Sequence, residues 1–518
     1  MNNPKAESLK KRYFFKLGGG LIGIPMAMVI AGIVPRVLGP AAYGNFTFLT
    51  EFFNKIIAFF DSGTSIGFYT KLSQRLSEIS IIKFYWFFVL SVSLIISIFV
   101  PVVFLLNKQN LLWPDQSVQF VWMALVFSLL NWSSSVVIQI VDAYGYTAKG
   151  EIVRFVRKIL GFLLILGLFF FKSLNLTTFF IYHYFGVLII IIGCRYLLKK
   201  CNIPLFPGIK LTLVQVKKYI KEFWIYSYPL LTSSFVALFV GLLDVWMLQK
   251  FAGPVQQGFY GLAFQISGIC FLFASSMTPL IMREFSIAFG NKDTDKMRFL
   301  FSHYIPMIYA LIAFLVVFIS YNSGFIVLLF GGKKFVEAKL AIALMVLYPL
   351  HQGYGQLSGS FFYATAQTKL LRNIGVTFMI IGLPVAYFLL APISIFGLDL
   401  GATGLAIKMI AMQFVVVNVL LYYNAKYLKI SFLKIFGHQM YIIVMFGLIA
   451  YISCFLSGLI MEESIFSFLL NGVIYTSLSI GMLFSFPIIF SLSRGELNRY
   501  VDMMISSNPL KRKKTDQI

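Results

Sequence analysis

Long runs of apolar residues follow one another along the chain, separated by short polar breaks. An α-helix rises about 1.5 Å per residue, so about 20 apolar residues cross the roughly 30 Å hydrocarbon core of a bilayer. A transmembrane β-barrel would instead show strands of about 10 residues with alternating polarity. The runs therefore predict an all-α polytopic membrane protein, because backbone groups in lipid must be paired within their own helix.

Fourteen of these runs are long enough to predict a transmembrane helix. The first six cover residues 14–35, 45–70, 84–106, 118–141, 152–171 and 177–198, and the next six cover residues 223–249, 258–282, 304–320, 341–364, 374–390 and 402–423. Two more cover residues 440–460 and 465–492. The longest predicted external loop, residues 321–338, is short, so we expect no large domain outside the membrane.

Lysine and arginine are distributed unevenly between alternate breaks. The chain has 43 lysine and arginine residues. Of these, 34 lie before the first apolar run, in every second polar break between runs or in the C-terminal tail, and 7 lie in the remaining breaks. Lys55 and Lys408 lie inside runs. Because cytoplasmic loops carry the excess of these residues, we predict a multi-pass membrane protein with both termini in the cytoplasm. The net charge of +24 then faces anionic lipid, and no nucleic-acid partner is expected.

Composition and motifs narrow the class further. Hydrophobic residues make up 59% and charged residues 12%, against about 45–50% and 25% in soluble globular proteins. These values exclude a disordered chain and a soluble enzyme. The sequence has no P-loop, no H-E-x-x-H and no G-x-S-x-G motif, and its four cysteines have no metal-binding spacing. We therefore expect no catalytic residue, no metal, no cofactor and no built-in ATPase.

Two short segments recur at nearly the same distance along the chain. A Gly-Pro pair followed by Tyr-Gly occurs at residues 39–44 and again at 253–261. Residues 148–154 are echoed by residues 366–372, and the two arginines that end these segments are separated by nearly the same distance as the two tyrosines. The offset spans six helices, an even number, so it predicts two halves of parallel topology.

The repeat divides the chain into a predicted order of segments. We expect an N-terminal six-helix lobe at residues 1–200, a basic cytoplasmic linker at 201–222 and a C-terminal six-helix lobe at 223–430. The extra helices 13 and 14, at residues 431–492, lie outside the repeat and precede a basic cytoplasmic tail at 493–518.

Three segments of the chain together form a pattern that is typical of one protein family. They are the Leu-Gly-Pro and Tyr-Gly segment at residues 38–44, Asp244 with Gly253 and Gly258-x-Tyr260, and the helix exit Pro279…Arg283. Over about residues 10–429 the chain resembles polysaccharide flippases of the multidrug/oligosaccharidyl-lipid/polysaccharide exporter superfamily. The resemblance implies two six-helix lobes around a central cavity. It also implies transport of an undecaprenyl-pyrophosphate-linked oligosaccharide to the outer leaflet of the bacterial inner membrane, driven by an ion gradient instead of ATP.

Ionisable residues inside the predicted helices are candidates for function, because each costs about 2.5 kcal/mol or more to insert into lipid. Glu51 and Lys55 are one turn apart and can pair on one face, while Asp61 lies about 15 Å beyond Glu51 along the same helix. We expect Asp61, Asp244 and Glu51 to couple transport to H⁺ or Na⁺. The alternatives are a structural pair of Glu51 with Lys55 and a solvated helix end at Asp244.

A lipid pyrophosphate brings about two negative charges into the cavity, so cationic partners are required. Among the cationic candidates for binding the pyrophosphate, Lys55 is the best one deep within a predicted membrane helix. The further substrate-binding candidates are Lys16, Arg154, Arg372 and Lys408, with polar and aromatic contacts to the sugar from Asn131, Gln139, Tyr363 and Gln413. The alternative for the cations is the positive-inside bias alone, or for Lys408 a side chain that reaches outward to the surface.

Three functions remain open from the sequence. A flippase for surface polysaccharide such as O-antigen accounts for the helices and the short loops, and polysaccharide polymerase or assembly proteins are expected partners. A multidrug/cation antiporter of the same superfamily would favour an acidic cavity and would not need Lys55. A membrane glycosyltransferase or polymerase is a third alternative, against which the short external loops argue.

Overall fold

The computed structural model describes residues 9–461, 464–491 and 494–499, and within these ranges the chain is helical without a strand. The first helices are α1 (Leu9–Asp61), α2 (Thr64–Gln74), α3 (Ser80–Leu105), α4 (Gln109–Leu112), α5 (Val118–Ala143), α6 (Thr147–Phe170), α7 (Leu176–Lys200), α8 (Leu213–Cys270) and α9 (Leu272–Gly290). They are followed by α10 (Thr294–Phe299), the π-helical turn η1 (Leu300–Tyr304), α11 (Ile305–Tyr321), α12 (Ser323–Phe330), the 3₁₀ turn η2 (Lys333–Ala338), α13 (Lys339–Met345) and α14 (Tyr348–Ala364). The last are α15 (Thr368–Leu390), η3 (Ile393–Ile395), α16 (Gly401–Leu428), α17 (Phe432–Ile460), α18 (Ile465–Ser485) and η4 (Pro487–Phe490).

Each predicted helix falls on an observed one, which confirms the all-α polytopic fold. Ten of the described helices are long and apolar enough to cross a membrane. This number is smaller than fourteen because α1 joins the first predicted helix to residues 45–61 of the second through a kink. In the same way, α8 joins the seventh predicted helix to residues 258–270 of the eighth, whose remainder forms most of α9. In addition, α6 carries five charged residues, and the predicted helix 341–364 is interrupted between α13 and α14, just before Pro349. Proline fits the first turn of a helix but not its interior.

The kinks in α1 and α8 lie at the predicted Gly-Pro breaks. Gly39 has φ 76° and ψ 168°, and Gly253 has φ 78° and ψ 179°, a backbone conformation that is essentially restricted to glycine. The proline that follows each glycine also disfavours the helical conformation at the preceding residue. The chain therefore bends at each Gly-Pro pair while the helix continues on both sides.

The observed register of the repeat differs from the expected one. Alignment of the two tyrosines would place Gly39 opposite Gln256, whereas the corresponding kink lies at Gly253. On the cytoplasmic side, alignment of the two arginines would place the start of α6 opposite Thr365, whereas α15 begins at Thr368. Each alignment is thus displaced by three positions. Such a shift keeps nearly the same face of a helix, so similar residues along one face do not fix the register.

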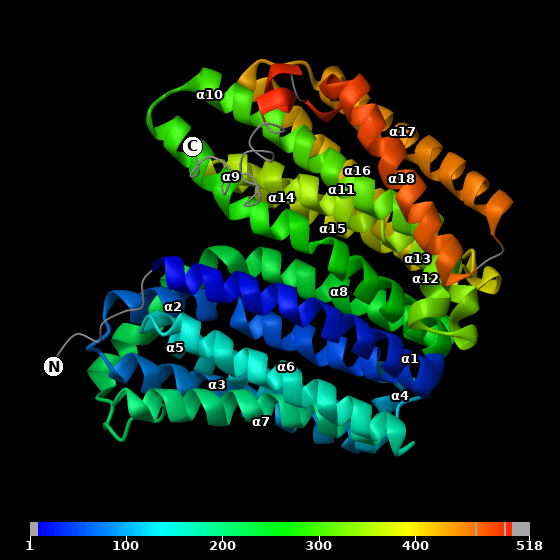
Figure 1. The fold of residues 1–518 in the computed structure, drawn as a ribbon. Helices are drawn as coiled ribbons and strands as arrows, with labels where there is room; N and C mark the ends of the chain where they lie inside the picture. The colour runs from blue at the N-terminus through cyan, green and yellow to red at the C-terminus, as the bar shows by residue number, and fades with distance from the viewer. Residues whose placement is uncertain (1–8, 462–463, 492–493, 500–518) are drawn as a thin grey trace, which may run out of the picture. The chain divides into compact units, whose positions relative to one another are not determined.

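The described residues of Met1–Gly261, Phe330–Phe335 and Leu383–Ala402 form one compact unit. Its long helices run side by side in Figure 1, with α1 packed on α5 and α6, and α7 packed on the same two helices. Where α1 crosses α8, a Cβ atom on Gly44 would come 1.9 Å from the carbonyl oxygen of Pro254. A Cβ atom on Gly258 would come 2.0 Å from the carbonyl oxygen of Pro40. The two copies of the Gly-Pro segment therefore meet reciprocally, at a distance that only glycine permits.

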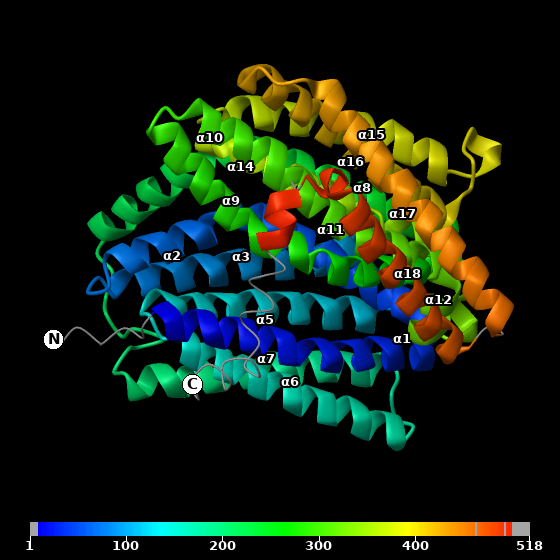
Figure 2. The same ribbon diagram turned by 45° about the horizontal axis from the view of Figure 1, so that its top comes forward.

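The described residues of Leu262–Leu329, Val336–Gly382 and Thr403–Ile518 form the second unit. In it α9 and α11 pack on α14, and α17 packs on α11 and α18. Figure 2 shows α17 and α18 lying along this bundle. Gln439 Nε2 of α17 donates to Asn418 Oδ1 (3.1 Å), and Tyr475 Oη of α18 donates to the carbonyl of Phe314 (2.8 Å). Helices 13 and 14 of the prediction are thus hydrogen-bonded into the second unit.

The units and the predicted lobes have different boundaries. The second predicted lobe begins at residue 223, but residues 223–261 group with the first unit, because α8 carries the close contact at Gly258. The predicted linker, residues 201–222, is helical from Leu213 onward. The six-helix lobes stay a prediction from the repeat, and residues 500–518 of the predicted tail lie outside the described residues.

Two local predictions are wrong. The predicted helix 45–70 is broken at Ser62 and Gly63, which have φ 35° and 82°. The predicted loop 321–338 contains the apolar helix α12 and the 3₁₀ turn η2. Within that segment Phe335 is fully buried and makes edge contacts with the rings of Tyr43 and Phe259, so its packing orders the backbone.

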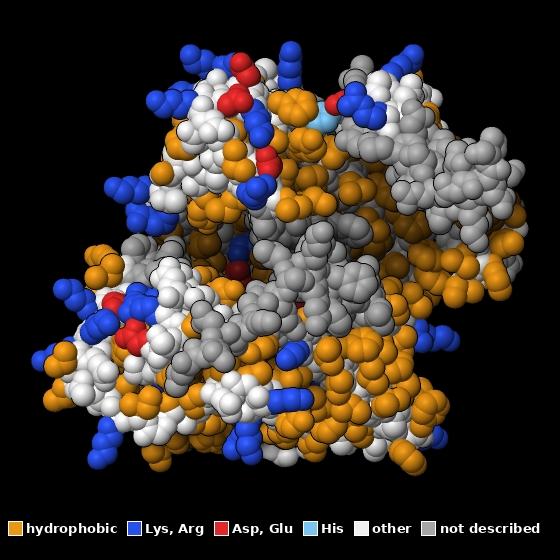
Figure 3. All heavy atoms as spheres, turned by 60° about the vertical axis from the view of Figure 1, so that its left-hand side comes forward, with side chains coloured by type: hydrophobic (Ala, Val, Ile, Leu, Met, Phe, Trp, Pro, Cys, Tyr) orange, Lys and Arg blue, Asp and Glu red, His pale blue; other side chains and the backbone are white. Residues whose placement is uncertain are grey.

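Large apolar side chains are exposed on helices of both units, such as Leu94 (62%), Ile192 (65%) and Phe455 (58%). Figure 3 shows hydrophobic side chains over much of one face, with charged side chains gathered in patches. Exposed apolar surface of this extent is stable in lipid and not in water. The chain is a multi-pass membrane protein.

Candidate functional site

Lys55 lies in the second half of α1, facing α8. Its Nζ atom is 3.4 Å from Glu51 Oε2, as expected for neighbours one turn apart. A Cβ atom on Gly241 of α8 would come 3.2 Å from Lys55 Cδ and 3.3 Å from Nζ. The lysine therefore rests on the bare backbone of α8, and the absence of a side chain at residue 241 leaves room for it. The Lys55 side chain is 29% exposed and that of Glu51 47% exposed, so both are accessible to a ligand.

Asp61 ends α1 at the break in the predicted second helix. Its Oδ1 atom accepts hydrogen bonds from the backbone N–H of Ser65 (3.0 Å), from Thr64 Oγ1 (2.9 Å) and from Tyr85 Oη (3.2 Å), and its Oδ2 atom accepts from Ser65 Oγ. The first turn of a helix leaves N–H groups without partners in the helix. Asp61 supplies an acceptor for one of them and so stabilises the start of α2.

Asp244 and Lys408 are both buried, with exposed fractions of 8% and 5%. Asp244 lies three residues after Gly241, so it occupies the face of α8 on which Lys55 rests. It is therefore not a solvated helix end. Lys408 of α16 does not reach outward to the surface, because its Cε atom would be 3.1 Å from a Cβ atom on Gly382 of α15. Both groups are held inside their units.

The remaining predicted substrate residues have other partners or none that bears on a ligand. Arg154 of α6 forms an ion pair with Asp142 of α5 (3.1 Å) and another with Glu151 of its own helix. Arg372 is exposed and donates to Asn373 Oδ1 through Nε and Nη2 (3.3 and 3.2 Å). Asn131 is exposed on α5, and the side chain of Lys16 lies outside the described residues. Within the first unit, the structure thus brings Lys55 and Glu51 to the face of α8 that carries Asp244.

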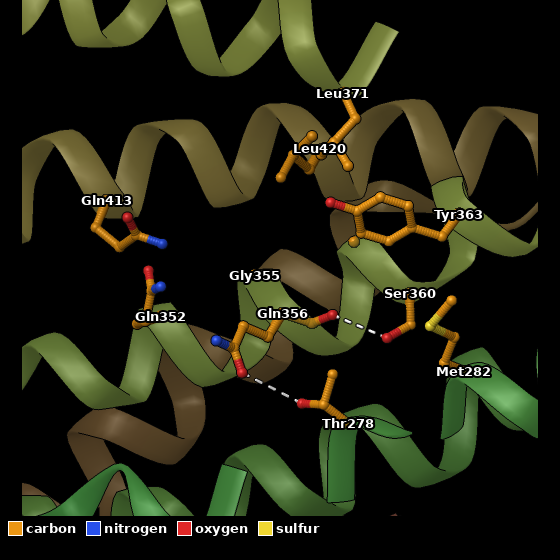
Figure 4. A pocket seen from close by; sticks show the side chains of 11 residues that line it. Thr278, Met282, Gln352, Gly355, Gln356, Ser360, Tyr363, Leu371, Gln413 and Leu420 are labelled. Atoms are coloured by element: carbon orange, nitrogen blue, oxygen red, sulfur yellow. Dashed lines mark hydrogen bonds between the residues drawn. The ribbon is translucent and has the colours of Figure 1, made fainter. Parts of the chain in front are cut away.

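A pocket of about 560 Å³ opens within the second unit, between α9, α14, α15 and α16 (Figure 4). Its volume is in the range of small-molecule sites, roughly 300–1,000 Å³. The lining residues are Thr278, Met282, Gln352, Gly355, Gln356, Gly359, Ser360, Tyr363, Leu371, Gln413 and Leu420. Gly355 brings α16 close, since a Cβ atom there would lie 2.8 Å from Val417 Cγ2 and 3.2 Å from Gln413 Nε2.

The polar groups of this pocket are neutral. Gln352 and Gln413 point toward one another across the space in Figure 4, and Thr278 Oγ1 donates to Gln356 Oε1 (3.3 Å). No described lining residue carries a charge. A carboxamide offers donors and an acceptor at one position, and the ring of Tyr363 offers an apolar face. Such a lining matches a ligand rich in hydroxyl groups, and it provides no counter-ion for a cation.

Sequence reasoning named Tyr363 and Gln413 but missed the glutamines of α14. Gln352, Gln356 and Ser360 follow at intervals of four residues, which places them on one face of a helix. That polar stripe in an otherwise apolar run was the available signal. The sequence of the predicted helix 341–364 could not show which residues face these side chains, because the facing residues come from α9 and α16.

Solved structures of low sequence identity share the fold. Lipid II flippase MurJ in an inward closed conformation aligns with a TM-score of 0.66 and 12% identity, over 91% of this chain and 99% of MurJ. An inward-facing multidrug resistance MATE family transporter of the MOP superfamily aligns with a TM-score of 0.62 and 13% identity, over 78% of this chain and 94% of that one. A MOP superfamily transporter from Pyrococcus furiosus Vc1 (DSM3638) aligns with a TM-score of 0.50 and 15% identity, over 79% and 94%.

Sequence comparison with curated proteins finds no match. The family model described as polysaccharide biosynthesis protein matches residues 9–285, which is more than half of the 518 residues. This match runs from the start of α1 into α9 and includes both Gly-Pro kinks, Lys55 and Asp244. The chain therefore belongs to the polysaccharide biosynthesis protein family.

Proposed function

We propose that this protein is a flippase that moves an undecaprenyl-pyrophosphate-linked oligosaccharide across the bacterial inner membrane for surface polysaccharide synthesis. The main observation in support is the neutral, amide-lined pocket of the second unit, which suits a sugar. The polysaccharide biosynthesis family and the MurJ fold support the same class of substrate. The protein then acts as a transporter and carries out no bond-making step.

The alternating-access cycle assigns separate roles to the residues. Lys55 pairs with the pyrophosphate, because a phosphate in a low-dielectric site needs a cationic partner. Gln352, Gln356 and Gln413 contact the sugar hydroxyl groups. A multidrug exporter of cations is the alternative that the MATE likeness raises. The absence of a carboxylate among the described lining residues of the pocket favours the sugar.

Reconstituted vesicles containing a fluorescent lipid-linked oligosaccharide test this function. We expect the fluorescent headgroup to become accessible to a membrane-impermeant quencher in the opposite leaflet, at a rate that rises with an imposed ion gradient. Transport of a cationic dye such as ethidium, without transport of the lipid-linked sugar, would assign the protein to the multidrug class instead.

Gln413→Leu is expected to slow sugar-lipid transport about fivefold to tenfold. The substitution keeps the approximate volume of the side chain but removes an amide that a buried hydroxyl group can use, and one such hydrogen bond contributes about 1 kcal/mol. Initial flipping rates in vesicles measure the effect. Gln119→Leu, at an exposed position of α5 outside the pocket, is the matched control. Equal rates for both variants would remove Gln413 from the sugar site.

Asp244 is the proposed site of the coupling cation among Asp61, Asp244 and Glu51. It is buried on the α8 face that Lys55 covers, whereas the four hydrogen bonds to Asp61 favour a structural role at the helix break. Asp244→Asn should leave flipping insensitive to the ion gradient, while Asp61→Asn should lower thermal stability and retain gradient dependence. The reverse result in reconstituted vesicles would move the coupling site to Asp61.

A further inference from the structure

Five charged side chains meet where α2 ends and α8 begins, within the first unit and at the predicted cytoplasmic side. Lys71 lies in the last turn of α2, and Arg75 follows that helix directly. Glu78 precedes α3, and Lys218 and Glu222 belong to the first turns of α8. All lie just outside the predicted membrane spans, which end at residue 70 and begin again at residues 84 and 223.

Glu222 joins α8 to both cations of α2. Its Oε2 atom is 2.9 Å from Lys71 Nζ and 2.7 Å from Arg75 Nη2, and its Oε1 atom is 3.4 Å from Arg75 Nη1. The arginine thus holds the carboxylate with two parallel donors, the same fork that recognises phosphate. The hydrogen bond from Arg75, aided by that from Lys71, lowers the pKa of Glu222 to about 2 against the opposing effect of burial. Glu222 is therefore an anion at any physiological pH.

Glu78 is held differently from Glu222. Arg75 Nη1 is 3.1 Å from Glu78 Oε2, within the same short segment of chain. Tyr219 Oη donates to Glu78 Oε1 (2.6 Å), and Lys218 Nζ is 3.3 Å from the same atom. Arg75 consequently remains oriented by Glu78 if Glu222 leaves, whereas removal of Glu222 takes one acidic partner from both Lys71 and Arg75. The pair of cations would then be open toward a second anion.

We propose that Lys71 and Arg75 form an entry site for the diphosphate group of a lipid carrier, and that Glu222 occupies this site until the lipid displaces it. The proposal rests on the flippase function and adds a site that the transport cavity does not include. A lipid diphosphate carries about two negative charges at headgroup depth, against one on Glu222. Its oxygens suit both the guanidinium fork and the point charge of the lysine. Displacement of Glu222 also frees the start of α8 from α2, so arrival of the lipid loosens this contact.

Binding of farnesyl pyrophosphate to the full chain in nanodiscs of zwitterionic lipid, measured by calorimetry, tests the site. Glu222→Gln keeps the shape of the side chain but removes the competing charge, so it should bind about fivefold more tightly, equivalent to about one exposed ion pair. Arg75→Gln should bind more weakly than the wild type. The Arg75→Gln/Glu222→Gln double variant should regain only part of that affinity, because removal of Glu222 then frees Lys71 alone. Glu284→Gln, which removes the ion pair of Glu284 with Lys296 (3.1 Å) in the second unit, is the matched control and should bind like the wild type.

An unchanged or weaker affinity of Glu222→Gln would overturn the proposal, since a purely structural ion pair predicts lower thermal stability without a gain in binding. The gain should persist when inorganic phosphate or phosphatidylglycerol is added in excess. Its loss with either competitor would assign the site to free phosphate or to bulk anionic lipid, and so would also overturn the proposal. Because the assay measures binding alone, a protein that fails to flip sugars can still pass it, and a working flippase can still fail it.

Discussion

Gly44→Ala is expected to prevent the first unit from folding normally, with a loss of about 3 kcal/mol or more in the free energy of unfolding. The added Cβ atom would lie 1.9 Å from the carbonyl oxygen of Pro254. A backbone carbonyl cannot rotate away as a flexible side chain can, so α1 and α8 must separate, and overpacking of this kind costs about 1–3 kcal/mol or more. Yield of monodisperse protein and the thermal midpoint in detergent measure the loss.

Two comparisons make this prediction specific. Gly258→Ala should behave like Gly44→Ala, because its Cβ atom would lie 2.0 Å from the carbonyl oxygen of Pro40. Gly268→Ala, farther along α8, has no atom within 4 Å of the added group and should be neutral or more stable by up to about 1 kcal/mol. Normal yield and an unchanged midpoint for Gly44→Ala would contradict the close crossing of α1 and α8 at Gly44.

Lys55→Ala is expected to reduce lipid-linked oligosaccharide transport about a hundredfold, while Lys55→Arg should retain part of it. The reason is the charge of the ligand: without Lys55 the pyrophosphate loses its cationic partner, and a charge-assisted hydrogen bond is worth about 1.5–3 kcal/mol. Arginine restores the charge but must fit over Gly241, where the lysine methylene already lies 3.2 Å from the Cβ position. Flipping rates in reconstituted vesicles measure the effect, with the exposed Lys172→Ala as control.

A double variant separates binding from structure at this position. Lys55 and Glu51 form an ion pair of 3.4 Å, so Lys55→Ala alone also leaves Glu51 without that partner. Lys55→Gln/Glu51→Gln removes both charges and should be as inactive as Lys55→Ala if the lysine binds the pyrophosphate. Recovery of transport in the double variant would make the pair structural, because two neutral amides can replace an ion pair without an unbalanced charge.

Local sequence patterns predicted most of the helices. Apolar runs of about 20 residues are sufficient evidence for a membrane helix, because lipid leaves the backbone no other means of pairing its polar groups. The Gly-Pro pairs at Gly39 and Gly253 lie in predicted breaks between helices, where the structure has bends within α1 and α8. Asp61 shows the limit of such evidence, because its break at Ser62 and Gly63 has no proline to mark it.

The sequence by itself determined the fold class, the kinks and the charged positions worth testing, because each depends on the properties of neighbouring residues. The tertiary structure decided the register of the repeat, the neutral pocket and the partners of each charge. Glu222 and Arg75 are 147 residues apart, and Gln413 faces Gln352 from another helix. Helical periodicity specifies which side chains share one face, but it does not specify which face of a distant helix packs against them, and that packing places these side chains together.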